Sequence, residues 1–122
     1  MSELIHFTIP AGPSTNRMYR SGKGRLYKSK LYKAWLHDAW GEILVQVTPE
    51  LLPGQVAVTI VAQPKDGRVR DVDNYCKAVL DGLEFWGFLT NDKQVNQLSI
   101  IRLDPDPLIN QHRLTIHLET SS

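Results

Sequence analysis

Asp71 and Asp73 are separated by one residue, and Lys77 follows one helical turn later. In an extended segment, side chains two residues apart point the same way, with Cα atoms roughly 6–7 Å apart. Two carboxylates at this spacing can converge on one hard divalent cation, because Mg²⁺ prefers an all-oxygen shell. Lys77 could then orient a phosphate or neutralise charge in a pentacovalent transition state. The spacing therefore indicates metal-dependent phosphodiester chemistry.

A plainer interpretation of the same residues remains open. Asp73 is an acceptable N-cap for a helix. Lys77 with Asp73 or Asp81 could form a surface ion pair that contributes less than ~1 kcal/mol. Asp71 favours the metal interpretation, because a simple cap does not need it and its repulsion with Asp73 is unfavourable unless a cation relieves it.

The second feature is a run of basic residues. Seven basic residues and no acidic one lie between positions 17 and 33: Arg17, Arg20, Lys23, Arg25, Lys28, Lys30 and Lys33. Such a stretch attracts a phosphate backbone without reading bases. Tyr19, Tyr27 and Tyr32 lie among these cations and could either stack on unpaired bases or pack internally. A solvated loop and helix surface is the alternative for the whole stretch.

The bulk composition sets limits on the class of protein. The chain has 122 residues, is 42% apolar and carries a formal net charge of +1. This length fits one domain, which we place at residues 1–122. A single cysteine, Cys76, excludes an internal disulfide and a thiolate zinc site. We find no signal peptide and no apolar run that could span a membrane, so a cytoplasmic protein is expected.

The elements that would position these residues follow from periodicity. We expect strands over residues 4–9, 55–63, 94–103 and 113–119, and a long loop from Pro10 to Lys28. A helix capped by Ser29 should run to about Val47, with a buried stripe of Leu31, Trp35, Ala39, Ile43 and Val47.

A second helix should run from Asp73 to about Trp86 and end at Gly87, with Cys76, Val79, Leu80 and Leu83 facing the core. Trp35, Trp40 and Trp86 are expected in the core or an interface.

The order β-α-β-α-β-β predicts an α+β fold. It would have a mixed four-stranded sheet and two helices packed on one face. Asp92 is a third acidic candidate, although Asn91-Asp92 is also a turn signal. A helix over residues 73–86 is about 20 Å long. Asp92 can reach Asp73 only if the chain doubles straight back, if the helix stops early near Gly82, or if Asp92 approaches the pair of a partner subunit.

Three blocks of sequence, in this order, resemble the RusA-type Holliday junction resolvases, which are small phage and prophage endonucleases. They are Gly12-Pro13-Ser14-Thr15-Asn16-Arg17-Met18-Tyr19-Arg20, the stretch from Arg70-Asp71-Val72-Asp73-Asn74 to Leu83, and Asn91-Asp92-Lys93-Gln94-Val95. The resemblance covers nearly the whole chain. Residues 65–70 depart from it, because only Arg68 and Arg70 stand where the family carries a denser arginine run.

The resemblance implies an Mg²⁺-dependent, structure-selective endodeoxyribonuclease, with Mn²⁺ as a substitute. It would resolve four-way DNA junctions by paired nicks during recombination and repair, as a homodimer. Asp71, Asp73 and Asp92 would be the catalytic metal ligands and Lys77 the essential lysine. The residues expected to contact DNA are Asn16, Arg17, Arg20, Lys23, Arg25, Lys28, Lys30, Arg68, Arg70 and Asn74.

Three other functions stay open on the residues alone. A non-catalytic phage DNA-binding protein would use the same basic stretch without needing Asp71, Asp73 and Lys77 together. A metal-dependent phosphodiesterase could act on another nucleic acid or a smaller phosphate ester. A partner-binding subunit would leave the acidic face merely solvated.

Overall fold

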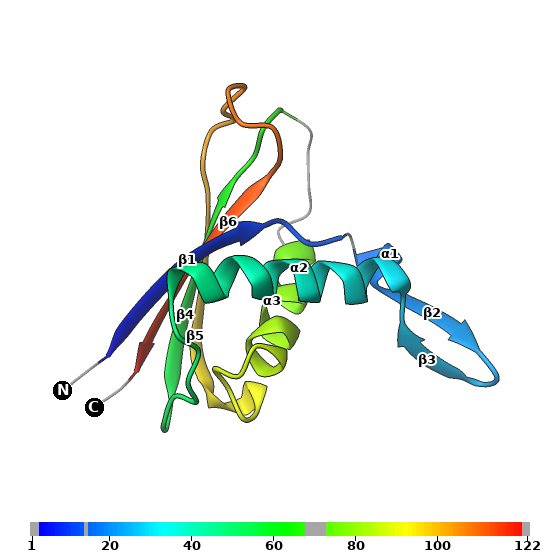
Figure 1. Ribbon diagram of the computed structural model, residues 1–122, viewed down its shortest axis with the longest axis horizontal. Helices are drawn as coiled ribbons and strands as arrows, with labels where there is room; N and C mark the ends of the chain where they lie inside the picture. Colours follow the sequence, from blue (N-terminus) through cyan, green and yellow to red (C-terminus); the bar gives the residue numbers. More distant parts are fainter. Residues whose placement is uncertain (1–2, 14, 68–72, 121–122) are drawn as a thin grey trace.

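The structure, a computed structural model, describes residues 3–13, 15–67 and 73–120, and among these it leaves out the side chains of residues 15, 16, 73 and 74. Its helices and strands follow one another along the chain as shown in Figure 1. They are β1 (Leu4–Pro10), α1 (Thr15–Met18), β2 (Tyr19–Gly22), β3 (Arg25–Lys28), α2 (Lys30–Gln46), β4 (Val56–Gln63), α3 (Asp73–Phe85), the 3-10 turn η1 (Asp92–Gln94), β5 (Val95–Arg102) and β6 (Arg113–Thr120).

The main sheet is mixed and has the strand order β1-β6-β4-β5. β6 pairs antiparallel with both β1 and β4, whereas β5 pairs parallel with β4. A parallel pair needs a crossover connection, and α3 lies in the segment that supplies it. The predicted α+β class, with four strands and two long helices, is therefore confirmed.

One face of this sheet carries the core. Alternate residues of β4 and β6 are buried, among them Val58, Ile60 and Ile116 at 0% exposure. The residues between them are half-buried, except for Glu119, which is exposed. The same hydrophobic cluster includes α2 through Ile43 and α3 through Val79. Both long helices thus pack on one face, as the order of the elements predicted.

Helix α2 begins at a capped serine and buries a different stripe from the predicted one. Ser29 Oγ accepts a hydrogen bond from the Tyr32 amide, 3.1 Å away, which confirms Ser29 as the N-cap. Leu31 was expected in the core but is 46% exposed, whereas Tyr32 and Leu36 are buried. An α-helix has 3.6 residues per turn, so positions spaced strictly by four move gradually off the buried face. The predicted stripe was therefore wrong at Leu31, in the first turn.

Helix α3 ends as predicted, where Gly87 has a φ of 87°. The amides of Phe88 and Leu89 both donate to the Leu83 carbonyl, which satisfies a terminal acceptor. The buried face was predicted only in part. Val79 and Leu83 are fully buried, but Cys76 and Leu80 are only half-buried.

The predicted loop over residues 10–28 was wrong. This segment contains α1 and a hairpin of β2 and β3. Gly22 pairs with Arg25 across a two-residue turn in which Lys23 and Gly24 have φ values of 52° and 77°. Positive φ at both turn positions is the geometry that matches the twist of a hairpin. The sequence signal was the Gly-Lys-Gly triplet, which breaks a short β alternation into two strands.

No helix in the described part of the chain combines the length and the apolar character needed to cross a membrane.

Candidate nucleic-acid interface and active site

The basic residues lie on a part of the molecule that projects from the sheet. We call α1, β2 and β3 (residues 15–28) the arm, and Figure 1 shows it extending beyond the end of α2. All seven predicted cations are exposed, five on the arm and two, Lys30 and Lys33, in the first turn of α2. Within the residues that the structure describes, none of the seven forms an ion pair.

The two ends of the arm are tied together by one buried serine. The Ser29 amide donates to the Met18 carbonyl at 2.8 Å, and its hydroxyl donates to the Arg17 carbonyl at 2.6 Å. Met18 itself is fully buried and anchors α1 in the core. The chain consequently leaves the body and returns to it at the same place, so the hairpin has a fixed base.

A second tie joins the arm to both long helices. The Tyr19 hydroxyl at the start of β2 and the Tyr32 hydroxyl on α2 each donate to Asp81 Oδ2 on α3, both at 2.8 Å. Tyr32 has no exposed surface. We refer to Tyr19 and Tyr32 as the tyrosine pair. The plainer interpretation of the sequence offered Asp81 as one possible ion-pair partner of Lys77. In the structure Asp81 accepts hydrogen bonds from two tyrosines that are distant in the sequence.

The pKa values of the tyrosine pair follow from this arrangement. Burial, followed by the hydrogen bond to Asp81, raises the pKa of Tyr19 to about 12, and the same causes raise the pKa of Tyr32. Both hydroxyls therefore stay protonated and act as donors at neutral pH.

Lys77 lies one turn before Asp81 on the exposed side of α3. Its Nζ atom is 5.4 Å from the centroid of the Tyr19 ring, a cation–π contact. This contact places the predicted essential lysine beside Tyr19, at the base of the arm.

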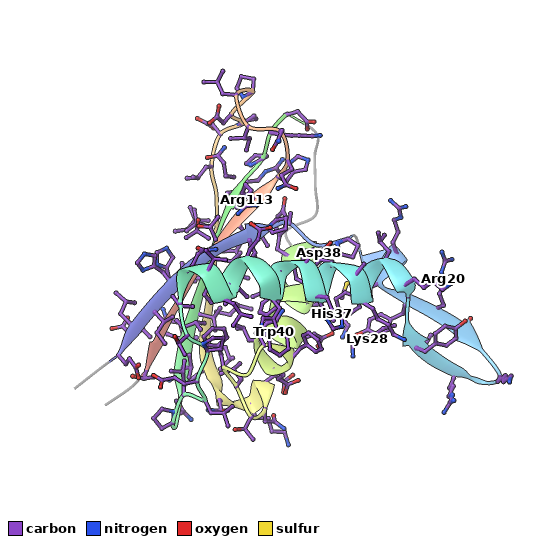
Figure 2. The ribbon with its side chains drawn as sticks, in the orientation of Figure 1. Arg20, Lys28, His37, Asp38, Trp40 and Arg113 are labelled. Carbon is purple, nitrogen blue, oxygen red and sulfur yellow. The ribbon has the colours of Figure 1, made fainter. Side chains whose placement is uncertain are left out.

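A groove of about 500 Å³ runs between the hairpin and the start of α2. Its lining contains five cations and no acidic residue: Arg17, Arg20, Lys28, Lys30 and Lys33. Figure 2 shows Arg20 and Lys28 at the arm end of α2, far from Arg113 over the sheet. A concave surface lined by one sign of charge focuses the field on an incoming anion. We call this feature the basic groove.

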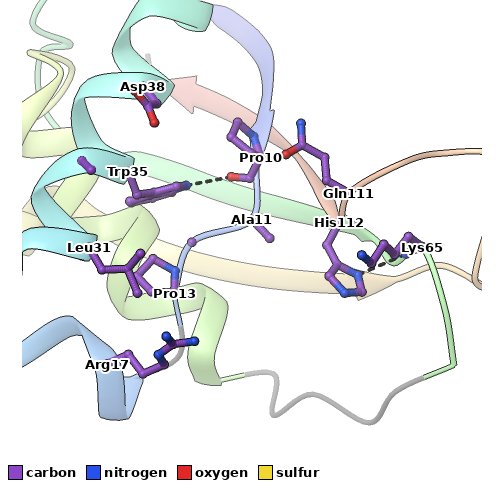
Figure 3. A pocket seen from close by; sticks show the side chains of 12 residues that line it. Pro10, Ala11, Pro13, Arg17, Leu31, Trp35, Asp38, Lys65, Gln111 and His112 are labelled. Atoms are coloured by element: carbon purple, nitrogen blue, oxygen red, sulfur yellow. Dashed lines mark hydrogen bonds between the residues drawn. The ribbon is translucent and has the colours of Figure 1, made fainter.

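A second cavity, of about 420 Å³, lies between β1, α2 and the end of β4 (Figure 3). Trp35 forms one wall, and its Nε1 donates to the Pro10 carbonyl at 2.9 Å. Arg17 and Lys65 also line this cavity and come from different sides of it, while Asp38 supplies an opposing negative charge. Arg17 lines both hollows, so the two form adjoining parts of one surface.

The acidic residues are placed only in part. Asp71, Arg68 and Arg70 lie outside the described residues, as do the side chains of Asn16, Asp73 and Asn74. Asp73 is the first residue of α3. In the parts of the chain that the structure describes, no three His, Cys, Asp or Glu side chains come close enough to hold a metal ion. The predicted metal ligands therefore stay a prediction.

Asp92 lies at the other end of α3 from Asp73. Its amide donates to Glu84 Oε1 at 2.9 Å, next to the last residue of the helix. The rise from Asp73 to Glu84 is about 16 Å. The helix does not stop at Gly82, and the chain does not retrace its length, so the structure shows neither of the two routes that would bring Asp92 to Asp73 within one subunit.

The turn that carries Asp92 is held firmly. Asn91 caps it by accepting from the Lys93 amide, and Gln94 Nε2 donates to the carbonyls of Leu52 and Gly54, each at 2.9 Å. The side chain of Asp92 is exposed and has no hydrogen-bond partner among the described residues.

Comparison with known proteins decides the family. The sequence pattern of the family described as Endodeoxyribonuclease RusA matches residues 9–119. This chain belongs to the RusA family. It is 33% identical to the crossover junction endodeoxyribonuclease of Enterobacteria phage 82 over 98 aligned residues, which are 80% of this chain and 82% of that protein. It is 33% identical to the RusA protein of Escherichia coli K12 over 96 aligned residues, which are 79% of this chain and 80% of that protein. The RusA protein of Enterobacteria phage HK97 is 29% identical over 97 residues, or 79% and 80% of the two chains.

Membership of the RusA family confirms the resemblance found in the sequence and makes the chain an endodeoxyribonuclease, a hydrolase of phosphodiester bonds. It disfavours the two non-catalytic alternatives, a DNA-binding regulator and a partner-binding subunit. The sequence reasoning missed the role of Ser29 at the arm base and of Asp81 between the tyrosines. Asp81 carried no local signal for this role, because its two donors are 62 and 49 residues away in the sequence.

Proposed function

We propose that this RusA-family nuclease is an Mg²⁺-dependent, structure-selective enzyme that resolves four-way (Holliday) junctions by paired nicks during recombination and repair. The observation that carries the proposal is the family match over residues 9–119, which includes every candidate acidic residue. The exposed cations of the arm support it, because phosphate contacts supply most of the affinity for a DNA backbone.

The candidate ligands suit magnesium by their chemistry. Asp71, Asp73 and Asp92 offer carboxylate oxygens only, which is the donor set that Mg²⁺ and Mn²⁺ accept. When bound, the metal supplies Lewis acidity and a lowered pKa for water. Asp71 and Asp73 would hold it from the start of α3, Asn74 would accept or donate a hydrogen bond beside them, and Lys77 would orient the scissile phosphate from one turn further along the helix.

The position of Asp92 supports an active site shared between subunits. In one chain Asp92 is tied to Glu84, about 16 Å along the helix from Asp73. Its carboxylate is exposed on a clamped turn. In a C₂ dimer each subunit can present Asp92 to the Asp71–Asp73 pair of the other. Two equivalent sites would then act on opposed strands of a junction that is itself nearly two-fold symmetric.

The basic groove would hold the arms of the junction. Arg17, Arg20, Lys28 and the two lysines of α2 converge on one concave surface. Contacts of this kind position DNA without selecting a sequence. Selection of a branched structure would therefore come from the spacing of two such grooves in the dimer, with Arg68 and Arg70 adding contacts close to the acidic pair.

The test measures binding and cutting separately on a labelled synthetic four-way junction. Replacing Asp71 or Asp73 with Asn should abolish Mg²⁺-dependent cutting while binding survives or strengthens, because a negative charge near the phosphates is removed. The control is Asp104→Asn, which removes the same charge from an exposed loop residue. Equal loss of binding and cutting in D71N and D73N, or metal-independent cutting by the wild type, would contradict the proposal.

A further inference from the structure

The two faces of the arm hairpin differ in chemistry. In an antiparallel ladder, directly paired residues project on the same side. Arg20 pairs with Tyr27 and Gly22 pairs with Arg25, so one face presents an aromatic ring between two guanidinium groups. The opposite face is formed by the pairs Tyr19–Lys28 and Ser21–Leu26.

Tyr27 differs from the other two tyrosines of the basic stretch. Tyr19 and Tyr32 use their hydroxyls on Asp81 and pack internally. The Tyr27 side chain is 51% exposed, and its hydroxyl has no partner among the described residues. A packing role would bury this ring, so the three tyrosines divide into two structural residues and one surface residue.

Glycine at position 22 keeps the Tyr27 ring close to the hairpin. A Cβ atom there would come within 3.3 Å of the ring. The ring therefore lies against the backbone and is supported on one side. A planar surface held in this way loses little conformational entropy when a second ring stacks on it.

Tyr27 also lines the basic groove beside Arg20, Lys28 and Lys30. Proteins that hold single-stranded nucleic acid combine a cationic groove for the backbone with aromatic rings on which bases stack. Both components are present here within one hollow, and its lining has no acidic residue.

We propose that Tyr27 is a stacking platform for an unpaired or unstacked DNA base, with the adjoining phosphates held in the basic groove. The inference rests on the proposed function, because a four-way junction offers such bases at its crossover. A continuous duplex keeps its bases stacked and would contact the groove through phosphates alone. Tyr27 would thus make the arm bind the branch point in preference to the flanking duplex.

The experiment compares three DNAs of matched length in metal-free buffer: a four-way junction, a single strand and a continuous duplex. Tyr27→Ala should weaken binding to the first two by about 5-fold to about 150-fold, the range expected for loss of one stacked base, and leave duplex binding within about 2-fold. Tyr27→Phe keeps the ring and should bind like the wild type. Tyr27→Leu covers Gly22 without an aromatic face and should behave like the alanine variant.

Leu26→Ala is the matched control, since it removes an exposed apolar side chain, 71% exposed, from the other face of the same hairpin. Unchanged junction affinity in Y27A, equal losses on all three DNAs, or a leucine variant as good as wild type would overturn the inference. A change in sedimentation of DNA-free Y27A would also overturn it, because the ring would then serve self-association. Failure of the wild type to cut junctions would instead count against the proposed function alone.

Discussion

Replacing Asp81 with alanine removes one acceptor on which the arm, α2 and α3 all depend. Asp81 Oδ2 receives two hydroxyl donors at 2.8 Å. Tyr32 has no exposed surface, so its hydroxyl depends on the carboxylate as its acceptor. Tyr19 is half-buried, and solvent can replace part of its bond.

The magnitude follows from these two environments. An unsatisfied buried hydroxyl costs about 1–3 kcal/mol, and a partly exposed bond to a charged group contributes about 1 kcal/mol. D81A should therefore lower the free energy of unfolding by about 2–4 kcal/mol. Tyr32→Phe removes the donor together with its need for a partner, and should cost about 1–2 kcal/mol.

Urea unfolding of the single and double variants measures these terms. If Tyr32 is orphaned in D81A, adding Y32F to D81A should cost almost nothing, which gives a coupling free energy of about 1–2 kcal/mol. D104A, an exposed aspartate, should stay within about 0.5 kcal/mol of the wild type. A D81A protein as stable as D104A, or strict additivity of D81A and Y32F, would refute the shared-acceptor interpretation.

Three further predictions concern packing, pH and salt. Gly82→Ala should destabilise the protein by about 1–3 kcal/mol in thermal melts, because the new Cβ would overlap the ring of buried Trp86. Gly41→Ala is the control: a Cβ there meets nothing within 4 Å, so this variant should stabilise α2 by about 0.5–1 kcal/mol. The raised pKa values of the tyrosine pair predict full stability below pH ~10, where unfolded tyrosine is still protonated, and a fall in stability as the pH rises toward the folded pKa of about 12 for Tyr19. Urea unfolding measured from pH 9 to 12 should show a smaller loss of stability with rising pH in Tyr32→Phe than in the wild type. A Tyr32→Phe profile identical to that of the wild type would contradict this prediction. Arg20→Ala should reduce the slope of log K against log salt for junction binding by about 0.9, and an unaltered slope would remove Arg20 from the phosphate contacts.

Much of the fold could be predicted because the core strands and helices carry clear periodicity. The alternation of Leu114, Ile116 and Leu118 located β6, and Ser29 and Gly87 located the two helix ends. These signals are local, since each depends on neighbouring residues in the chain. Leu31 shows their limit, because a residue in the first turn of a helix can match the apolar period and still extend past the core.

The arm and its attachments could not be predicted in the same way. The hairpin has four-residue strands and depends on positive φ at Lys23, a residue type with no preference for that conformation. The bonds from Tyr19 and Tyr32 to Asp81 span 62 and 49 residues of sequence. Contacts at that separation are set by tertiary packing, and no spacing rule reports them.

Candidate site residues could be named from the sequence by type and by resemblance, but their grouping in space could not. The sequence placed Asp71 and Asp73 near each other and left three routes for Asp92. The observed length of α3 and the bond between the Asp92 amide and Glu84 leave the route through a partner subunit as our proposal.

Mixing two inactive variants tests this shared site most directly. Asp73→Asn and Asp92→Asn proteins should each fail to cut a four-way junction in Mg²⁺. After subunit exchange, a mixed dimer would contain one doubly altered site and one intact site, so roughly a quarter of the wild-type sites should return at equal mixing, seen as single nicks without paired cutting. If native mass spectrometry shows that mixed dimers form and no nicking returns, Asp92 does not act across the dimer, and the shared active site is refuted.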